Sequence, residues 1–179
     1  MKICHVINSL SGGGAETHLL DLVHAQKNQG HSVTVISTGP DKKNMKSLEQ
    51  EFKDVSDNVL RLYFPRLFNF YSYIKFFKNL KDEQYDIVHT HQPRSDFMFF
   101  ILKSITRIEA KWIVSIHGKY DTYLEGNILF DQIRKLFMPL LVNIWNKSNQ
   151  KICISEEVKI WLNTYKIKSN ISVVNYWIN

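Results

Sequence analysis

The sequence has few of the features that indicate a secreted, membrane-spanning or repetitive protein. Its only two cysteines are Cys4 and Cys153, and both fall within expected strands. We therefore interpret them as buried, reduced thiols of a cytoplasmic protein, rather than as a disulfide or a metal site. No apolar run approaches the roughly eighteen residues that cross a bilayer. The first residues lack a signal peptide's charged-then-apolar order, and we find no internal repeat or low-complexity linker.

Charge is moderate and excludes little by itself. The net charge is +6 over 179 residues and is not concentrated in a tail, so an acidic partner is allowed but not required. Nucleic-acid binding is disfavoured, because no RNA or DNA motif is found and many basic residues lie among aromatic ones in one expected helix. The hydrophobic content is 44%, enough for one α/β domain with a single core.

Apolar patterning alternates between strand and helix along the chain. The expected strands are Lys2–Ile7, His31–Ser37, Asn58–Leu62, Tyr85–His91, Lys111–Ile116, Gln150–Ile154 and Ile171–Val174. The expected helices begin near Ala15, Met45, Asn69, Ser95, Asn127 and Glu156. Gly30 is expected to end the first helix, and Pro139 to break or kink the fifth. This alternation predicts a doubly wound, mostly parallel sheet of about seven strands with helices on both faces.

A run of three glycines, Gly12–Gly14, separates the first strand from the first helix. Glycine can take positive φ and lets a ligand or another backbone come close. The following helix would direct unpaired N–H groups beyond the strand end, which suits phosphate or sugar hydroxyls. Because the spacing is not the dinucleotide motif G-x-G-x-x-G, a tight turn that binds nothing is an equal alternative on this evidence alone.

Three histidines are expected at the same edge of the sheet as these glycines. His89 and His91 lie at the end of the fourth strand, and His117 follows the fifth. In parallel α/β sheets, ligands bind beyond the carboxyl ends of the strands, near the switch in strand order. The histidine pair has no third ligand close in sequence, so we expect no metal. Asp121, four residues after His117, is a further candidate residue of the site at this edge.

Five segments in this order resemble the N-terminal domain of a GT-B glycosyltransferase, and within that class the retaining family 4 group. They are Ser11-Gly12-Gly13-Gly14-Ala15-Glu16, Gly30-His31-Ser32-Val33-Thr34-Val35, Tyr85-Asp86-Ile87-Val88-His89-Thr90-His91, Ser115-Ile116-His117-Gly118, and Ile152-Cys153-Ile154-Ser155-Glu156 with Ile171-Ser172-Val173-Val174. The resemblance implies two Rossmann-like domains facing across a cleft. The second domain would hold most of the nucleotide-sugar.

The resemblance also implies that residues 1–179 form one acceptor-side domain without the C-terminal donor-binding domain. No two glutamates have the spacing of the Glu, seven residues, Glu motif by which that second domain grips the donor. We therefore expect this domain to be inactive alone. The Asn-Gly-Ile/Val-Asp that usually follows the last strand is replaced by Tyr176-Trp177-Ile178-Asn179, which lacks the glycine and the aspartate of that motif.

Site roles follow from the resemblance. It implies that His117 lies close to the transferred sugar as the catalytic residue, either accepting as a neutral ring or stabilising negative charge as a cation. Gly12–Gly14 would bring backbone amides to the donor diphosphate or the acceptor. His91 and Arg94 would line the acceptor pocket. Glu16 would contact the acceptor or stabilise the helix start, and we favour the helix role.

For the full-length protein, the resemblance implies transfer of a hexose from a nucleotide-diphosphate sugar to a glycan or lipid-linked acceptor. The transfer would retain anomeric configuration, in cell-surface polysaccharide or lipopolysaccharide synthesis, without metal or other cofactor. Two alternatives stay open. One is a non-catalytic glycan- or lipid-binding module, and the other is a sugar-nucleotide epimerase of GT-B shape.

The stretch from Leu60 to Lys81 is basic and aromatic, with no acidic residue. One helical face is expected to pack onto the sheet: Phe70, Tyr73, Ile74, Phe77 and Leu80. Tyr71 and Phe76 fall outside that face. Beside the basic residues Arg66, Lys75 and Lys78, such aromatics would suit an anionic membrane surface, with the protein peripheral on the inner face of the cytoplasmic membrane. The alternative is an ordinary core helix with a solvated basic face.

Overall fold

The computed structural model describes residues 1–62, 70–120, 128–167 and 170–175, with side chains in the fifth helix described from Leu136 onward. The strands are β1 (Lys2–Ile7), β2 (Ser32–Ser37), β3 (Asn58–Arg61), β4 (Ile87–His91), β5 (Lys111–Ile116), β6 (Gln150–Cys153) and β7 (Ile171–Val173). The helices are α1 (Gly14–Asn28), α2 (Glu49–Val55), α3 (Phe70–Glu83), α4 (Pro93–Ile105), α5 (Ile128–Trp145) and α6 (Glu156–Asn163). Every expected strand and helix is therefore present, and Pro139 lies inside α5 rather than ending it.

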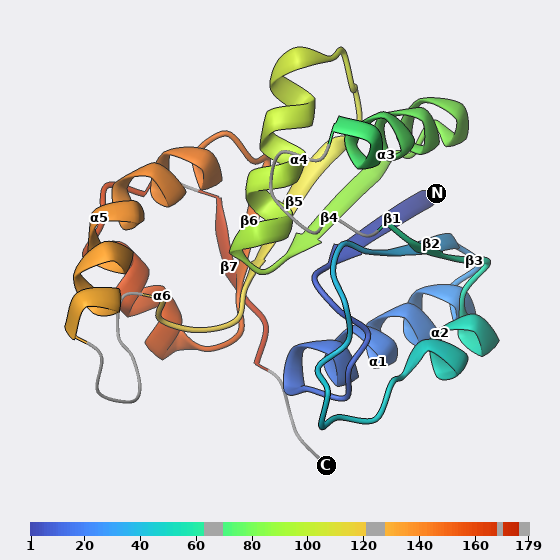
Figure 1. Cartoon of the computed structure of the whole chain (residues 1–179), viewed down its shortest axis with the longest axis horizontal. Helices are drawn as coiled ribbons and strands as arrows, with labels where there is room; N and C mark the ends of the chain where they lie inside the picture. Colours follow the sequence, from blue (N-terminus) through green and yellow to red (C-terminus); the bar gives the residue numbers. More distant parts are fainter. Residues whose placement is uncertain (63–69, 121–127, 168–169, 176–179) are drawn as a thin grey trace.

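The strands form one parallel sheet in the order β3-β2-β1-β4-β5-β6-β7 (Figure 1). The chain first winds outward from β1 to β3, then returns through α3 to place β4 on the other side of β1. Strand order thus reverses between β1 and β4, which is where ligands bind in sheets of this kind. The predicted fold class, a doubly wound parallel sheet, is confirmed.

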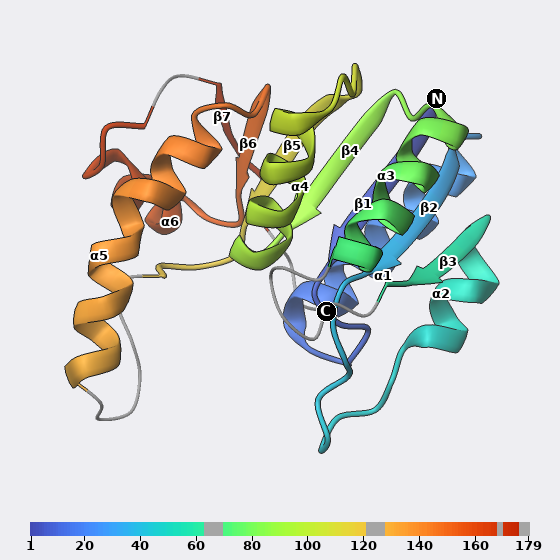
Figure 2. The same ribbon diagram turned by 45° about the horizontal axis from the view of Figure 1, so that its top comes forward.

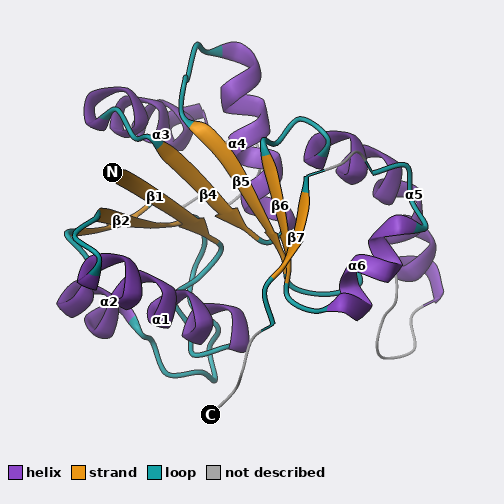
Figure 3. Cartoon of the chain, turned by 180° about the vertical axis from the view of Figure 1, so that it is seen from behind, coloured by secondary structure: helices purple, strands orange, loops and turns teal. Residues whose placement is uncertain are grey.

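Helices cover the two faces of the sheet unequally. Helices α1 and α2 pack on the β1–β3 half of one face, around Leu19, Val23 and Phe52 (Figure 3). Helices α3 and α4 lie along the opposite face (Figure 2), where a larger core extends from Cys4 to Trp145. The side chain of His5, next to Cys4 in β1, therefore points toward the α1 layer.

The cysteines and the first helix end behave as expected. Cys4 and Cys153 are free and buried, and burial raises the pKa of both thiols, that of Cys153 to about 11. Gly30 follows α1 with φ +78°, and its amide donates to the Lys27 carbonyl. That left-handed conformation is one that glycine adopts without strain, so the sequence signal for the helix end has a direct structural cause.

The packed face expected for α3 was partly wrong. Tyr73 and Leu80 are buried and Phe77 packs against the core as expected, but Phe76, which the pattern placed outside that face, is completely buried. Phe70 and Ile74, expected in the core, are 78% and 48% exposed. The buried face is therefore turned around the helix axis from the predicted one.

Packing against α4 explains the turn of α3. The ring of Phe76 lies 6.4 Å from that of Phe99, measured between centroids. Aromatic residues cover more than half of the circumference of α3, so the sequence allows more than one orientation, and the neighbouring helix selects one. Phe76 is consequently removed from the candidate membrane surface, whereas Lys75 and Lys78 are exposed as expected. Arg66 lies outside the described residues.

Candidate functional site

The candidate site lies at the carboxyl edge of the sheet. Strand β1 ends at Ile7, β4 at His91 and β5 at Ile116, and these three strands are parallel neighbours. The glycine turn after β1 and His117 after β5 therefore emerge at the same edge, on the two sides of β4. This confirms the geometric expectation on which the sequence-based site depended.

Two amides of the glycine turn donate to carbonyls of the chain, rather than being open to a ligand as expected. The amide of Gly12 donates to the Lys46 carbonyl at 2.8 Å, and that of Gly13 to the Ser11 carbonyl at 2.7 Å. None of the three glycines has a positive φ, and Gly13 is extended at φ −89° and ψ 168°. Around Gly14, by contrast, an added Cβ would meet no atom within 4 Å. Because the amides of Gly12 and Gly13 already donate within the chain, the predicted contact with a ligand falls on Gly14 and the first turn of α1.

A carboxylate lies against Gly13, so any side chain at this position would have to displace it. A Cβ at this position would stand 2.5 Å from Oε2 of Glu16 and 3.8 Å from Nζ of Lys42. Glu16 is 2% exposed and accepts from the Ser9 hydroxyl at 3.0 Å and, more weakly, from Gln92 Nε2 at 3.5 Å. Glu16 thus joins the turn, the start of α1 and the loop after β4, which agrees with the helix-start role; contact with an acceptor stays a prediction.

Gln92 has an unusual backbone conformation at this edge. It caps α4 with φ +83° and ψ 146°, a region that residues with a Cβ rarely occupy. Such strain persists only where the surroundings hold it, and it concentrates at functional sites. Gln92 directly follows His91, and nothing in the neighbouring sequence indicated this backbone conformation.

His117 is partly buried at the edge. Burial, with a smaller effect of His18, lowers its pKa to about 4, so the neutral ring is the form present at pH 7. Of the two forms that the sequence left open, this favours the neutral one. Its backbone amide donates to the Tyr120 hydroxyl at 3.0 Å, and Nε2 lies 3.4 Å from Nδ1 of His91. His91 is fully buried behind it, so its predicted contact with an acceptor would run through His117.

Four imidazoles form a connected group, which we call the histidine cluster: His5, His89, His91 and His117. His5 was missed by the sequence reasoning, although it pairs with His89 in the β1–β4 register. Its Nδ1 lies 3.1 Å from Nε2 of His91, and its Nε2 lies 2.8 Å from Oε1 of Gln26. His89 Nε2 lies 2.8 Å from the Ser115 hydroxyl, with its ring centroid 4.2 Å from that of His91.

The cluster supplies the third potential metal ligand that the sequence lacked nearby. Atoms of His5, His89 and His91 that could bind an ion lie within 4.8 Å of one another. Burial lowers the pKa of all three rings, which keeps them neutral and so able to donate a lone pair. None of the hydrogen bonds described for these rings involves a carboxylate that would balance a dication.

Three further residues complete the edge. Burial is the main cause of the lowered pKa values of the cluster imidazoles, and His18, half-buried on α1 and also missed, adds a smaller lowering. Lys42, in the loop after β2, brings an exposed ammonium over the glycine turn, and a loop lysine gives no sequence signal. Arg94 lies on the first turn of α4, with its guanidinium near Gly39, as expected for a residue beside the edge. Asp121 lies outside the described residues.

The chain is similar to several glycosyltransferases of known structure. The Anabaena protein Alr3699/HepE, crystallised with UDP and glucose, has a TM-score of 0.74 and 14% identity, over 100% of this chain and 45% of that one. Sucrose-phosphate synthase from Thermosynechococcus elongatus has a TM-score of 0.69 and 16% identity, over 100% of this chain and 49% of that one. A glycosyltransferase from Rickettsia africae has a TM-score of 0.65 and 23% identity, over 99% of this chain and 43% of that one. At these identities the likeness shows the fold alone.

The chain thus spans slightly less than half the length of these structures, and it has the fold of the N-terminal domain of GT-B glycosyltransferases. No curated protein matches its sequence. The model of the family described as Glycosyltransferase Family 4, however, matches residues 12–179, which include the glycine turn and the whole histidine-lined edge except His5. The chain therefore belongs to glycosyltransferase family 4.

Proposed function

We propose that the full-length protein transfers a hexose from a nucleotide-diphosphate sugar to a glycan or lipid-linked acceptor with retained configuration. Family membership and the fold support a transferase, and the similar Anabaena protein was crystallised with UDP and glucose. The observation that carries the proposal is the shared edge, where the open first turn of α1 and a neutral His117 emerge on either side of β4. Cell-surface polysaccharide or lipopolysaccharide synthesis is the proposed setting.

Within that reaction, this domain would supply the acceptor side of a cleft, and a C-terminal domain would hold most of the donor. Diphosphate charge would be met by the N-terminus of α1 at Gly14 and by the Lys42 ammonium, without a metal or other cofactor. The neutral His117 ring would accept a hydrogen bond from a sugar hydroxyl and so fix the sugar's orientation. Because residues 1–179 span less than half the length of the similar structures, we expect that they do not transfer sugar by themselves.

Transfer assays on the full-length protein with a panel of nucleotide sugars test this function. The His117→Ala variant should lower kcat roughly hundredfold, the order of effect of one preorganised polar group, while binding of UDP stays within about twofold. His24→Ala, which removes an exposed imidazole of α1 away from the edge, is the matched control. A near-normal rate for His117→Ala would remove this residue from the mechanism. No transfer from any donor, in a protein that binds UDP, would contradict the activity itself.

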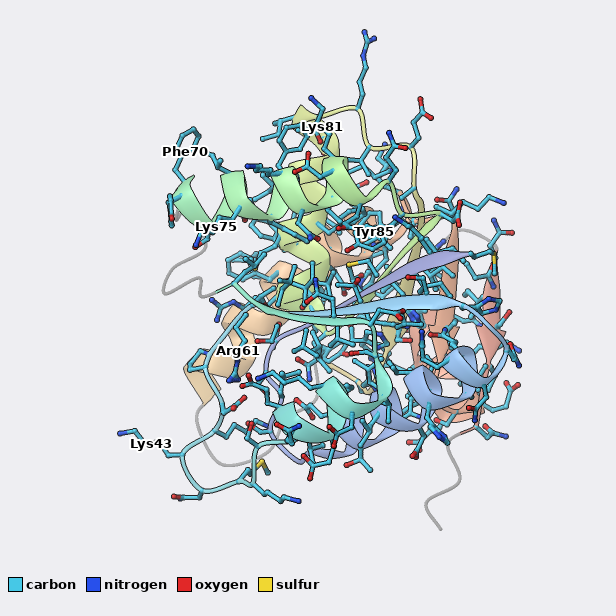
Figure 4. All side chains as sticks on the ribbon, turned by 90° about the vertical axis from the view of Figure 1, so that its right-hand side faces the viewer. Lys43, Arg61, Phe70, Lys75, Lys81 and Tyr85 are labelled. Atoms are coloured by element: carbon cyan, nitrogen blue, oxygen red, sulfur yellow. The ribbon has the colours of Figure 1, made fainter. Side chains whose placement is uncertain are left out.

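We also propose that α3 meets an anionic membrane surface, with the protein on the cytoplasmic side. Its exposed residues include Phe70, Tyr71 and Ile74 beside Lys75 and Lys78. Phe70 projects away from the body of the molecule (Figure 4). Exposed apolar side chains next to lysines suit the boundary between headgroups and acyl chains. None of the helices in the described parts of the chain is long and apolar enough to span a bilayer.

Sedimentation with vesicles tests the α3 surface. The protein should pellet with vesicles that contain anionic lipid and not with neutral ones, and added salt should weaken the interaction. Ile74→Ser should reduce binding without unfolding the chain, because the side chain is half exposed. Ile160→Ser, an exposed apolar position on α6, is the control and should bind normally. Failure to pellet with either kind of vesicle would end the proposal.

A further inference from the structure

A continuous line of side chains runs from helix α1 to the candidate site. It begins at Gln26 near the end of α1, passes His5 in β1 and His91 at the end of β4, and reaches His117 beyond β5. The three links are 2.8 Å from Gln26 Oε1 to His5 Nε2, 3.1 Å from His5 Nδ1 to His91 Nε2, and 3.4 Å from His91 Nδ1 to His117 Nε2. Each inner ring uses one nitrogen on each side.

The protons along this line are not independent. A neutral imidazole has one N–H donor and one bare nitrogen that accepts, whereas an amide oxygen can only accept. The bond to Gln26 Oε1 therefore requires the proton of His5 on Nε2, which leaves Nδ1 to accept from His91 Nε2–H. By the same reasoning His91 Nδ1 accepts, and His117 must donate through Nε2.

We propose that Gln26 is a positioning residue that keeps the proton of His117 on Nε2 and leaves Nδ1 as an acceptor, acting through His5 and His91. A residue on the far part of α1 would thus set how the imidazole at the edge can meet a ligand. The tautomer is a property of the domain itself. Its consequence for sugar transfer rests on the function proposed above.

Burial strengthens the centre of this line of hydrogen bonds from Gln26 to His117, which we call the relay. His5 and His91 are both completely excluded from solvent, so water cannot replace the link between them, and breaking it leaves a buried polar nitrogen unsatisfied. His89 does not compete for the line, because its Nε2 is engaged by the Ser115 hydroxyl, which can donate or accept. Reversal of the Gln26 amide would reverse every proton along the line, so the amide orientation is the point to test.

Nitrogen-15 NMR of the histidine rings in the 179-residue chain tests the proposal at about pH 8, where the rings are neutral. Two-bond correlations from the carbon-bound ring protons distinguish a protonated nitrogen from a bare one. His5, His91 and His117 should all carry the proton on Nε2. A proton on Nδ1 of His117 in the unmodified chain would overturn the proposal.

Substitutions at Gln26 separate a positioning role from a merely structural one. Gln26→Glu keeps an acceptor at the same place and should preserve the three tautomers. Gln26→Met keeps the shape but removes the acceptor, so the bare-nitrogen signal of His117 should move toward the average of the two tautomers. An unchanged His117 spectrum in Gln26→Met would contradict the role. His91→Phe interrupts the line at its centre, and it should alter His117 while leaving His5 protonated on Nε2.

A cobalt(II) titration of the chelator-treated chain tests the rival explanation that these rings hold a metal. The relay predicts no visible ligand-field absorption and no change in the ring tautomers. Stoichiometric binding that removes the protons between His5 and His91 would overturn the relay in favour of a metal site. Because neither measurement depends on sugar transfer, a protein that proved to have another activity would leave this result intact.

Discussion

The histidine cluster should make the domain acid-sensitive at unusually mild pH. Burial lowers the pKa of His5 and His117 from 6.5 to about 4, and it lowers those of His89 and His91 well below 6.5. As pH falls below 6.5, the unfolded chain binds protons that the folded chain does not. The free energy of unfolding therefore decreases as the pH falls from 7 toward 4.

The size of the effect follows from these shifts. Between pH 7 and pH 5, an imidazole with a folded pKa of about 4 loses about 2 kcal/mol of stabilisation, because each pKa unit corresponds to about 1.4 kcal/mol. The rings of His5 and His117 together lose about 4 kcal/mol, and His89 and His91, whose pKa values burial also lowers, add to that loss. Asp96 acts in the opposite direction: burial raises its pKa to about 7, against hydrogen bonds from Thr90 and Trp145, and restores about 2 kcal/mol. The net loss is therefore at least about 2 kcal/mol, a substantial part of the stability of an ordinary domain, about 5–15 kcal/mol.

Urea unfolding at a series of pH values measures this loss directly. The slope of the unfolding free energy against pH near 5.5 should correspond to about three protons taken up on unfolding. His89→Leu should reduce the slope by about one proton, whatever it does to stability itself. His24→Gln removes an exposed ring outside the cluster and should leave the slope unchanged. A stability that stays constant between pH 7 and pH 5 would refute the assignment of neutral, buried imidazoles.

Two predictions concern the glycine turn. Gly13→Ala should destabilise the chain by about 1–3 kcal/mol, because its Cβ would displace the Glu16 carboxylate. Chemical denaturation of Gly13→Ala, Glu16→Ala and the double variant should show that much of this cost disappears once Glu16 is replaced, and additive effects would contradict the contact. Gly14→Ala should instead leave stability unchanged or raise it by up to about 1 kcal/mol, because its Cβ would meet no atom within 4 Å. It should weaken UDP binding if a phosphate approaches the first turn of α1. Calorimetry measures both quantities, and unchanged binding would remove Gly14 from the site.

The strands were predictable because each is a short apolar run bounded by turn residues. The segments Lys2–Ile7 and Lys111–Ile116 coincide with their predictions at both ends, and Gly30 ends α1 with the positive φ that only glycine takes freely. Helix ends were less certain. The second helix begins at Glu49 rather than near Met45, because the preceding loop is held by its own contact, the Leu48 amide donating to the Leu10 carbonyl.

Two errors share one physical cause, which is that the decisive partner comes from a distant segment. The phase of α3 was set by Phe99 of α4, which no local periodicity in α3 contains. His5 was overlooked because a lone histidine in a strand is ordinary until β4 is placed beside β1. The glycine run and His117 were identified because their signals are local, a turn without side chains and a polar residue directly after a strand.

The arrangement at the edge indicates why these features occur together. Backbone strain at Gln92 costs of the order of 1–3 kcal/mol and needs support. Glu16 contributes to it through its bond to Gln92 Nε2, and the Ser95 hydroxyl donates to Asn8 at 3.0 Å, so both ends of the β4–α4 turn are held to the β1 side. His91, directly before Gln92, is thereby fixed between His5 and His117. The glycine turn and the histidine cluster are therefore connected through Glu16 and Gln92, because Glu16 contacts the residue that directly follows His91.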